Sequence, residues 1–197
     1  MSSPERRAAI VAAASRLFAE RGFRGTTTRE LASAVGVTEP VLYEHFRSKR
    51  DLYRAIIETK SREGMERVAA EIEPLMRRND DRGVFSRLAK LIMDRYAREP
   101  AFFRLLLFLA LEGDELAGLF YRRQILEAHR LVAGYIRRRM GEGDFRRMDP
   151  AVAVRAFLAM PVHHSMVRLL FDDQFVKASR KRTIEGMVDV FLQGVRR

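Results

Sequence analysis

The chain has 197 residues, of which 47% are hydrophobic, which suffices for one small and one medium-sized folded domain. The formal net charge of +11 favours polyanionic partners, but residues 1–60 carry only 11 Lys/Arg against 7 Asp/Glu, so charge alone does not locate a DNA surface. Cysteine is absent, which excludes disulfides and thiol catalysis, and neither a signal peptide nor a membrane-spanning run is found, so we expect a cytoplasmic protein without membrane contact.

The predicted secondary structure is helical throughout. Apolar residues recur at three- and four-residue spacing, and sustained two-residue alternation is absent. We therefore expect an all-α fold of about nine helices. Their predicted ranges are 4–22, 28–35, 39–46, 48–73, 83–98, 101–111, 115–140, 150–172 and 178–195.

Two short helices joined by a glycine turn are predicted within residues 26–46. Thr27 and Glu30 have the spacing of a capping box, in which the hydroxyl accepts from a backbone N–H and the carboxylate bonds back to the cap. Gly36 stands where a left-handed residue ends a helix without a steric cost. This layout is a helix-turn-helix, so double-stranded DNA is the first partner to consider.

The second of these helices has an unusual outer face. Thr38 is its predicted N-cap, and Pro40 is tolerated in the first turn, where N–H groups have no intrahelical partner. Leu42 and Phe46 lie four residues apart and are expected to face the core. The other side chains, a proline, a tyrosine and a histidine among them, then face outward, which favours a binding surface.

Two runs, AAASRLFAERGFRGTTTRELA over 12–32 and GVTEPVLYEHFRSKRDLYRAI over 36–56, resemble the tetracycline-repressor (TetR) family of bacterial transcriptional regulators. The remainder of the chain fits the family in length and helical character. The features that carry the resemblance are Phe18 and Gly22-Phe23 at the end of the first helix, the Thr-rich entry to the second, the Gly36-Val37 turn, the Leu42-Tyr43 pair and the Phe46-x-Ser48-Lys49 close.

The resemblance implies a DNA-binding domain over residues 1–48 and a ligand-binding and dimerisation domain over residues 49–197. It also implies that two copies of the protein bind a palindromic operator, with Tyr43 and Lys49 positioning the DNA backbone. The implied DNA-binding residues are Thr28, Arg29, Thr38, Glu39, Pro40, Tyr43, His45 and Lys49.

Glu39 departs from the chemistry that the resemblance implies. Many relatives carry a basic, amide or small residue at this position. A carboxylate can accept a hydrogen bond from cytosine N4, so Glu39 is predicted to specify a base. The alternative is that it is a solvated cap that repels nearby phosphates.

The fourth helix is predicted to link the two domains. Ser48 and Asp51 have the spacing of a cap, and the helix should run past Gly64 and end near Pro74. The polar residues 77–83 are then expected to form a loop. Movement at the far end of this helix would reach the DNA-binding domain.

The fifth to seventh predicted helices are rich in aromatic residues, which fill a bundle core or line a cavity for a small hydrophobic effector. The resemblance favours a cavity, and the apolar walls favour a xenobiotic or a fatty-acid-like molecule. No cofactor is expected. The predicted pocket residues are Phe85, Leu88, Ile92, Tyr96, Phe103, Leu107, Phe108, Tyr121, Ile125, His129, Met160, His163 and His164.

An enzyme is not expected. His163 and His164 are adjacent on a helix, where side chains point about 100° apart and rarely share a metal ion. No metal-binding, phosphate-binding or nucleophile motif accompanies them. Two roles remain for these histidines. They pack in a core or an interface, or they are polar groups of the pocket.

The last two helices indicate a homodimer. Asp149 and Pro150 make a good helix start, and the helix over 150–172 is apolar nearly all round, so it needs cover on both sides. A two-fold dimer would pack it with the final helix into a four-helix bundle. The predicted interface residues are Val152, Leu170, Ile184, Met187, Val188, Phe191 and Leu192.

Three functions therefore remain consistent with the sequence. The first is a dimeric repressor that a small hydrophobic effector releases from its operator. The second is a DNA-binding module whose second domain has no pocket and serves dimerisation or protein contact. The third is a helical enzyme, which a convergent set of titratable groups in a cavity would favour.

Overall fold

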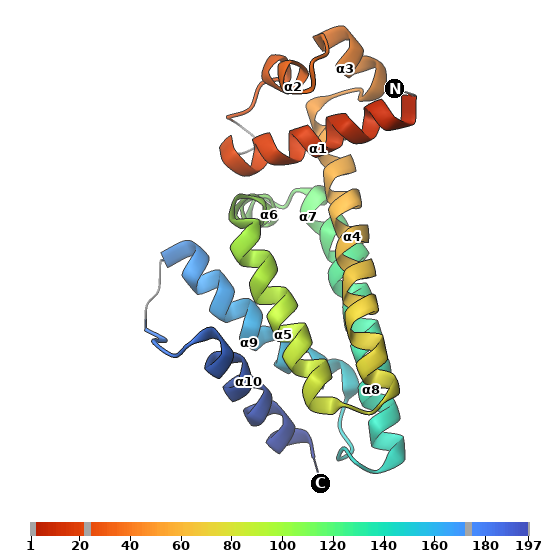
Figure 1. The fold of residues 1–197 in the computed structure, drawn as a ribbon, viewed down its shortest axis with the longest axis vertical. Coiled ribbons are helices and arrows are strands. Elements are labelled where there is room, and N and C mark those ends of the chain that lie inside the picture. Colours follow the sequence, from red (N-terminus) through yellow and green to blue (C-terminus); the bar gives the residue numbers. More distant parts are fainter. Residues whose placement is uncertain (1–2, 22–24, 172–174, 197) are drawn as a thin grey trace. The chain divides into compact units, whose positions relative to one another are not determined.

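The computed structural model describes residues 3–21, 25–171 and 175–196, and over these ranges its regular elements are all helical, as predicted (Figure 1). The predicted ends of two helices, at Gly22 and Asp172, and the Gly22-Phe23 pair lie outside the described residues. The helices are α1 (Ser3–Arg21), α2 (Thr28–Val35), α3 (Glu39–His45), α4 (Lys49–Arg77), α5 (Asp81–Arg98), α6 (Pro100–Leu111), α7 (Glu115–Phe120), α8 (Leu126–Glu142), α9 (Pro150–Phe171) and α10 (Arg180–Val195).

The predicted loop over 77–83 is present but is only three residues long, because α4 continues through Pro74 to Arg77 and α5 begins at Asp81. Asn79 adopts a left-handed conformation with φ of 56°, which ends α4 where the sequence offers no glycine. Asp80 then caps α5, since its Oδ1 accepts from the N–H of Gly83 at 2.8 Å. Only three residues, 78–80, therefore separate the end of α4 from the start of α5.

The predicted helix over 115–140 contains a π-helical turn, η1 (Tyr121–Ile125), between α7 and α8. The Nδ1 of His129 donates to the carbonyl of Ile125 at 2.6 Å, directly after this turn. An extra residue in one turn changes which side chains share a face, so Gln124 is buried and Tyr121 is exposed.

The chain forms two compact units, the first from residues 1–63 and 99–123 and the second from residues 64–98 and 124–197. This division cuts α4, whereas the domain boundary predicted from the sequence follows residue 48. That boundary remains a prediction.

The core of the first unit brings the start of the chain together with α6. Helix α1 packs against both α2 and α6. Ile10, Leu31 and Leu52 are buried in this unit. The rings of Phe102 and Phe120 meet edge to face at 5.7 Å between centroids.

The core of the second unit centres on three phenylalanines from three helices. Phe85 of α5 lies 4.8 Å from Phe157 of α9 and 4.6 Å from Phe191 of α10, measured between ring centroids. All three side chains are buried. Helices α5, α9 and α10 are therefore joined by one aromatic cluster.

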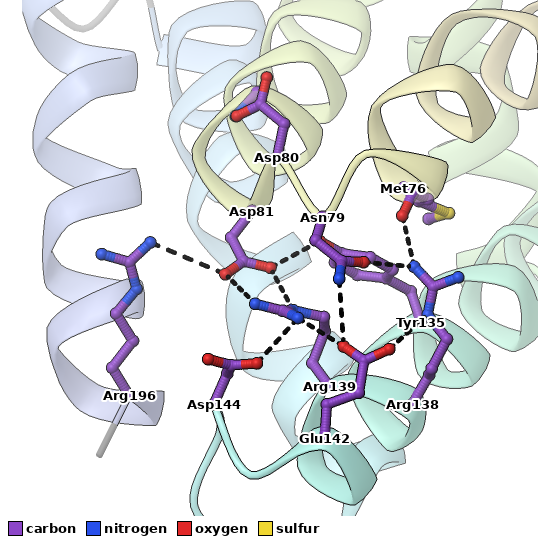
Figure 2. Close-up of polar contacts among 11 residues, drawn as sticks. Met76, Asn79, Asp80, Asp81, Tyr135, Arg138, Arg139, Glu142, Asp144 and Arg196 are labelled. Carbon is purple, nitrogen blue, oxygen red and sulfur yellow. Dashed lines mark hydrogen bonds and ion pairs between the residues drawn. The ribbon is translucent and has the colours of Figure 1, made fainter.

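A buried polar cluster closes one end of the second unit (Figure 2). Asp81 and Arg139 are only 6% and 7% exposed, and Arg139 Nε donates to Asp81 Oδ1 at 3.0 Å. The Tyr135 hydroxyl donates to the same oxygen at 2.5 Å. Burial, followed by the hydrogen bond to Asp81, raises the pKa of Tyr135. Arg139 also pairs with Glu142 and Asp144, so its charge is compensated.

Candidate nucleic-acid interface

The caps of α2 form as predicted. Thr27 Oγ1 accepts from the N–H of Glu30 at 3.2 Å, and Glu30 Oε2 accepts from the N–H of Thr27 at 2.7 Å. Gly36 ends the helix with φ of 73°, which lies in the left-handed region. The chain is thus free to turn sharply into α3.

Helix α3 places apolar side chains inward and a mixed set outward, as the pattern predicted. Leu42 and Phe46 are buried, and the Arg7 guanidinium lies 4.7 Å from the centre of the Phe46 ring. Tyr43, the residue that follows Leu42, is 47% exposed. Thr38 occupies the N-cap position, but its side chain makes no capping hydrogen bond, so the predicted cap is wrong in that detail.

The side chains predicted to contact DNA come from α2, α3 and the start of α4, all in the first unit. Arg29 is 89% exposed, and Thr38, Pro40 and Tyr43 are exposed as well. The half-buried members of the set are Thr28, Glu39, His45 and Lys49. Their DNA contacts remain predictions.

The Glu39 side chain accepts hydrogen bonds from two residues of α2, and the sequence did not predict these contacts. Thr28 Oγ1 donates to Glu39 Oε2 at 2.7 Å, and Arg29 Nε lies 3.4 Å from Glu39 Oε1. Three of the predicted DNA-binding residues therefore form one polar cluster, which we call the Thr28–Arg29–Glu39 cluster. The signal in the sequence is an acid in the first turn of α3, at a position where many relatives carry basic, amide or small residues.

The first turn of α4 is fixed on two sides. Ser48 Oγ accepts from the N–H of Asp51 at 3.1 Å, which confirms the predicted cap. Arg50 donates to both oxygens of Asp114 at 2.7 and 2.8 Å, a bidentate pair with the residue that caps α7. Burial lowers the pKa of Lys49, and the nearby Glu30 carboxylate opposes this shift.

The predicted pocket residues are divided between the two units. Phe85 and Leu88 are buried in the core of the second unit, while Phe108 and Tyr121 of the first unit are exposed. The members in the first unit are Phe103, Leu107, Phe108 and Tyr121, and those in the second are Phe85, Leu88, Ile92, Tyr96, Ile125, His129, Met160, His163 and His164. The pocket remains a prediction.

An open groove of about 720 Å³ lies elsewhere on the second unit. It is formed by the end of α4, the start of α5 and the start of α10, and Pro74, Leu75 and Ile184 contribute its apolar wall. None of the predicted pocket residues lines it. Its arginines are engaged in ion pairs, Arg87 with Glu71 and Arg180 with Asp94.

The predicted dimer residues separate into three groups by exposure. Val152 and Leu170 are exposed on α9, as an interface requires. Met187 is half-buried. The other four, Ile184, Val188, Phe191 and Leu192, are buried in the core of their own unit. These four residues stabilise the fold of the subunit itself, because the side of α10 that carries them packs against α5 and α9.

Two family descriptions match the chain over most of its length. Residues 10–56 match the bacterial regulatory proteins of the tetR family, and residues 82–194 match the C-terminal domain of AefR-like transcriptional repressors. The chain belongs to the TetR family of transcriptional regulators. It is therefore a DNA-binding helix-turn-helix protein, as the resemblance of residues 12–56 implied.

Individual relatives agree with this assignment. The transcriptional activator FasR of Mycolicibacterium smegmatis is 44% identical over 54 residues, which cover 27% of this chain and only 25% of FasR. The nucleoid occlusion factor SlmA of Marinobacter nauticus is 31% identical over 147 residues, which cover 73% of this chain and 71% of SlmA. A TetR-family regulator from Mesorhizobium loti shares the fold, with a TM-score of 0.86 over 100% of both chains at 19% identity.

TetR-family regulators are not enzymes, and the family assignment carries that conclusion to this chain. Within the described residues, no three His, Asp or Glu side chains are grouped to hold a metal ion. None of the described helices is long and apolar enough to cross a membrane.

A buried amide in this TetR-family regulator was also missed from the sequence. Gln124 is buried on the π-helical turn, and its Oε1 accepts no hydrogen bond within the described part of the chain. A buried polar atom without a partner is costly, so such atoms often belong to binding sites. A glutamine that directly follows two arginines indicates a solvent-exposed position, so the sequence gives no signal of its burial.

Proposed function

We propose that the protein is a dimeric repressor that binds a palindromic operator through α2 and α3 and is released from it by a small hydrophobic effector. The exposed outer face of α3, held by a buried inner face and by the caps of α2, carries this proposal. As a bacterial DNA-binding regulator it would act in the cytoplasm. It would need no cofactor.

We assign the dimer contact to the exposed faces of α9 and α10. On α9 the exposed residues Val152, Ala156, Ala159 and Leu170 fall on one helical stripe. On α10, Val190 is 67% exposed between two exposed glycines. Apolar side chains on two adjacent helices suit a two-fold four-helix contact. The dimer would space two copies of α3 one DNA turn apart, about 34–36 Å.

We assign effector binding to the aromatic and π-helical part of the chain. Gln124 has a buried amide oxygen that accepts no hydrogen bond in the described part of the chain, and His129 follows one turn later, which suits an effector with a polar head group. Because α4 is one helix from Lys49 to Arg77, an effector that displaced its far end would move its first turn as well. The effector can act only by binding one conformation more tightly than the other.

The experiment starts with selection of binding sites from random duplex DNA, followed by gel shifts with the selected site. A palindromic consensus is expected. A screen of fatty acids and hydrophobic xenobiotics by thermal shift then identifies compounds that raise the melting temperature, and these should release the selected DNA. Failure to select any sequence would refute operator binding.

The second candidate is a DNA-binding module that has no effector pocket. The burial of Phe85 and Leu88 in the core favours it, since these two predicted pocket residues already have packing partners. Under this candidate the protein selects a DNA site, yet no compound in the screen changes its affinity for that site.

A further inference from the structure

The Thr28–Arg29–Glu39 cluster turns both oxygens of one carboxylate toward the start of α2. Oε2 accepts from the Thr28 hydroxyl at 2.7 Å, and Oε1 lies 3.4 Å from Arg29 Nε. We infer that Glu39 competes with DNA phosphate for Thr28 and Arg29, and thereby weakens binding to DNA of any sequence. This inference rests on the proposed binding of DNA through α2 and α3.

The competition follows from the number of donors. A threonine hydroxyl has one hydrogen, so Thr28 cannot donate to Glu39 and to a phosphate at the same time. Arg29 has further N–H groups and is 89% exposed, yet a carboxylate beside it offsets its charge. Carboxylate and phosphate are both anions that favour the same donors and the same end of a helix.

Readout of a base by Glu39 is the less favoured alternative. To accept from cytosine N4, a carboxylate oxygen must face the major groove. Both oxygens of Glu39 instead face α2, and its side chain is partly covered there. Because the carboxylate offsets the charge of Arg29, its removal restores one positive charge, which at about 6 Å from a phosphate in water strengthens binding about threefold, or roughly tenfold for a dimer that uses both subunits.

Glu39→Gln tests the inference, because glutamine keeps the size of the side chain and an acceptor for Thr28 but removes the charge. Binding to a random-sequence duplex is measured by fluorescence anisotropy over a series of KCl concentrations. We expect affinity to rise roughly tenfold at low salt, and the salt slope to steepen by about 2 per dimer as Arg29 neutralises one more phosphate in each subunit. Melting curves verify that the variant is folded.

Glu44→Gln is the matched control, because Glu44 is exposed on the same helix and carries the same charge outside the cluster. It should give a clearly smaller gain. In an Arg29→Gln background the gain from Glu39→Gln should largely vanish. An equal gain from Glu44→Gln, or a full gain without Arg29, would overturn the inference.

Two other outcomes separate this inference from the proposed function. If the protein binds its selected duplex but Glu39→Gln changes only the base preference at a constant salt slope, Glu39 is a reader and the competition is refuted. If the protein binds neither the selected nor the random duplex, the proposed function fails, and the inference fails with it.

Discussion

Two clusters in this regulator combine a carboxylate, an arginine and a hydroxyl, and they differ in burial. Asp81, Arg139 and Tyr135 are covered by protein, whereas Arg29 beside Glu39 is almost fully exposed. Water screens the exposed charges, so that cluster contributes little to folding and remains free to act on DNA. In the buried cluster each group depends on the others, because an isolated buried charge is costly. The same three chemical groups thus stabilise the fold in one place and, under the inference above, modulate DNA binding in the other.

The largest expected effect is the loss of the buried carboxylate. Asp81→Ala removes the buried carboxylate that accepts hydrogen bonds from both Arg139 and Tyr135, and at about 1.5–3 kcal/mol for each bond to a charged group this should lower the free energy of unfolding by about 3–6 kcal/mol. Urea denaturation followed by circular dichroism measures this change. Asp80→Ala is the control, since Asp80 is exposed and only caps α5, and it should cost about 1 kcal/mol. Equal losses in the two variants would contradict the assignment.

The hydroxyl of the buried cluster should contribute less. Tyr135→Phe removes a hydrogen bond to a charged group and keeps the ring, so it should cost about 1.5–3 kcal/mol. The same denaturation experiment gives the value. Tyr121→Phe, at an exposed position, should leave the unfolding free energy nearly unchanged. A neutral Tyr135→Phe would mean that Arg139 alone satisfies Asp81.

Lys49→Ala extends the comparison to DNA binding. If Lys49 contacts a phosphate in each subunit, the variant should weaken binding to all sequences alike and lower the salt slope by about 2 per dimer. Anisotropy titrations with selected and random duplexes measure both quantities. A loss confined to the selected duplex, at an unchanged slope, would show that Lys49 specifies sequence instead.

The smallest expected effect is the change in the free energy of unfolding when Arg29 of the exposed cluster is replaced. Arg29→Gln should change the free energy of unfolding by less than about 0.5 kcal/mol, because exposed ion pairs contribute little. Denaturation of the variant and the parent protein under one buffer tests this. A loss as large as that of Asp81→Ala would erase the distinction between the two clusters.

Features that depend on neighbouring residues were predictable from the sequence. The capping box of Thr27 and Glu30 and the left-handed Gly36 follow from spacing alone, and both are confirmed. The left-handed Asn79 was not predicted, because asparagine ends a helix less often than glycine.

Contacts between distant residues were beyond the sequence pattern. Tyr135 and Asp81 are separated by 54 positions, and no local rule pairs them. The packing partners of the apolar residues of α10 were also not predictable from the sequence pattern. Periodicity identifies the apolar face of a helix but does not say which of two partners covers it, so Val188 of the core was predicted at the dimer interface, whereas the exposed Val190 was not.

The π-helical turn at Tyr121–Ile125 has a consequence for the evolution of the chain. Each residue advances an α-helix by about 100°, so one residue inserted into a turn rotates every later side chain by about that angle. A single-codon insertion is the simplest origin of such a turn, and deletion of one residue from this segment would restore a regular helix. Relatives that lack the insertion should then place a different side chain where Gln124 now lies, and an ungapped alignment through this segment would match residues that point about 100° apart on α8.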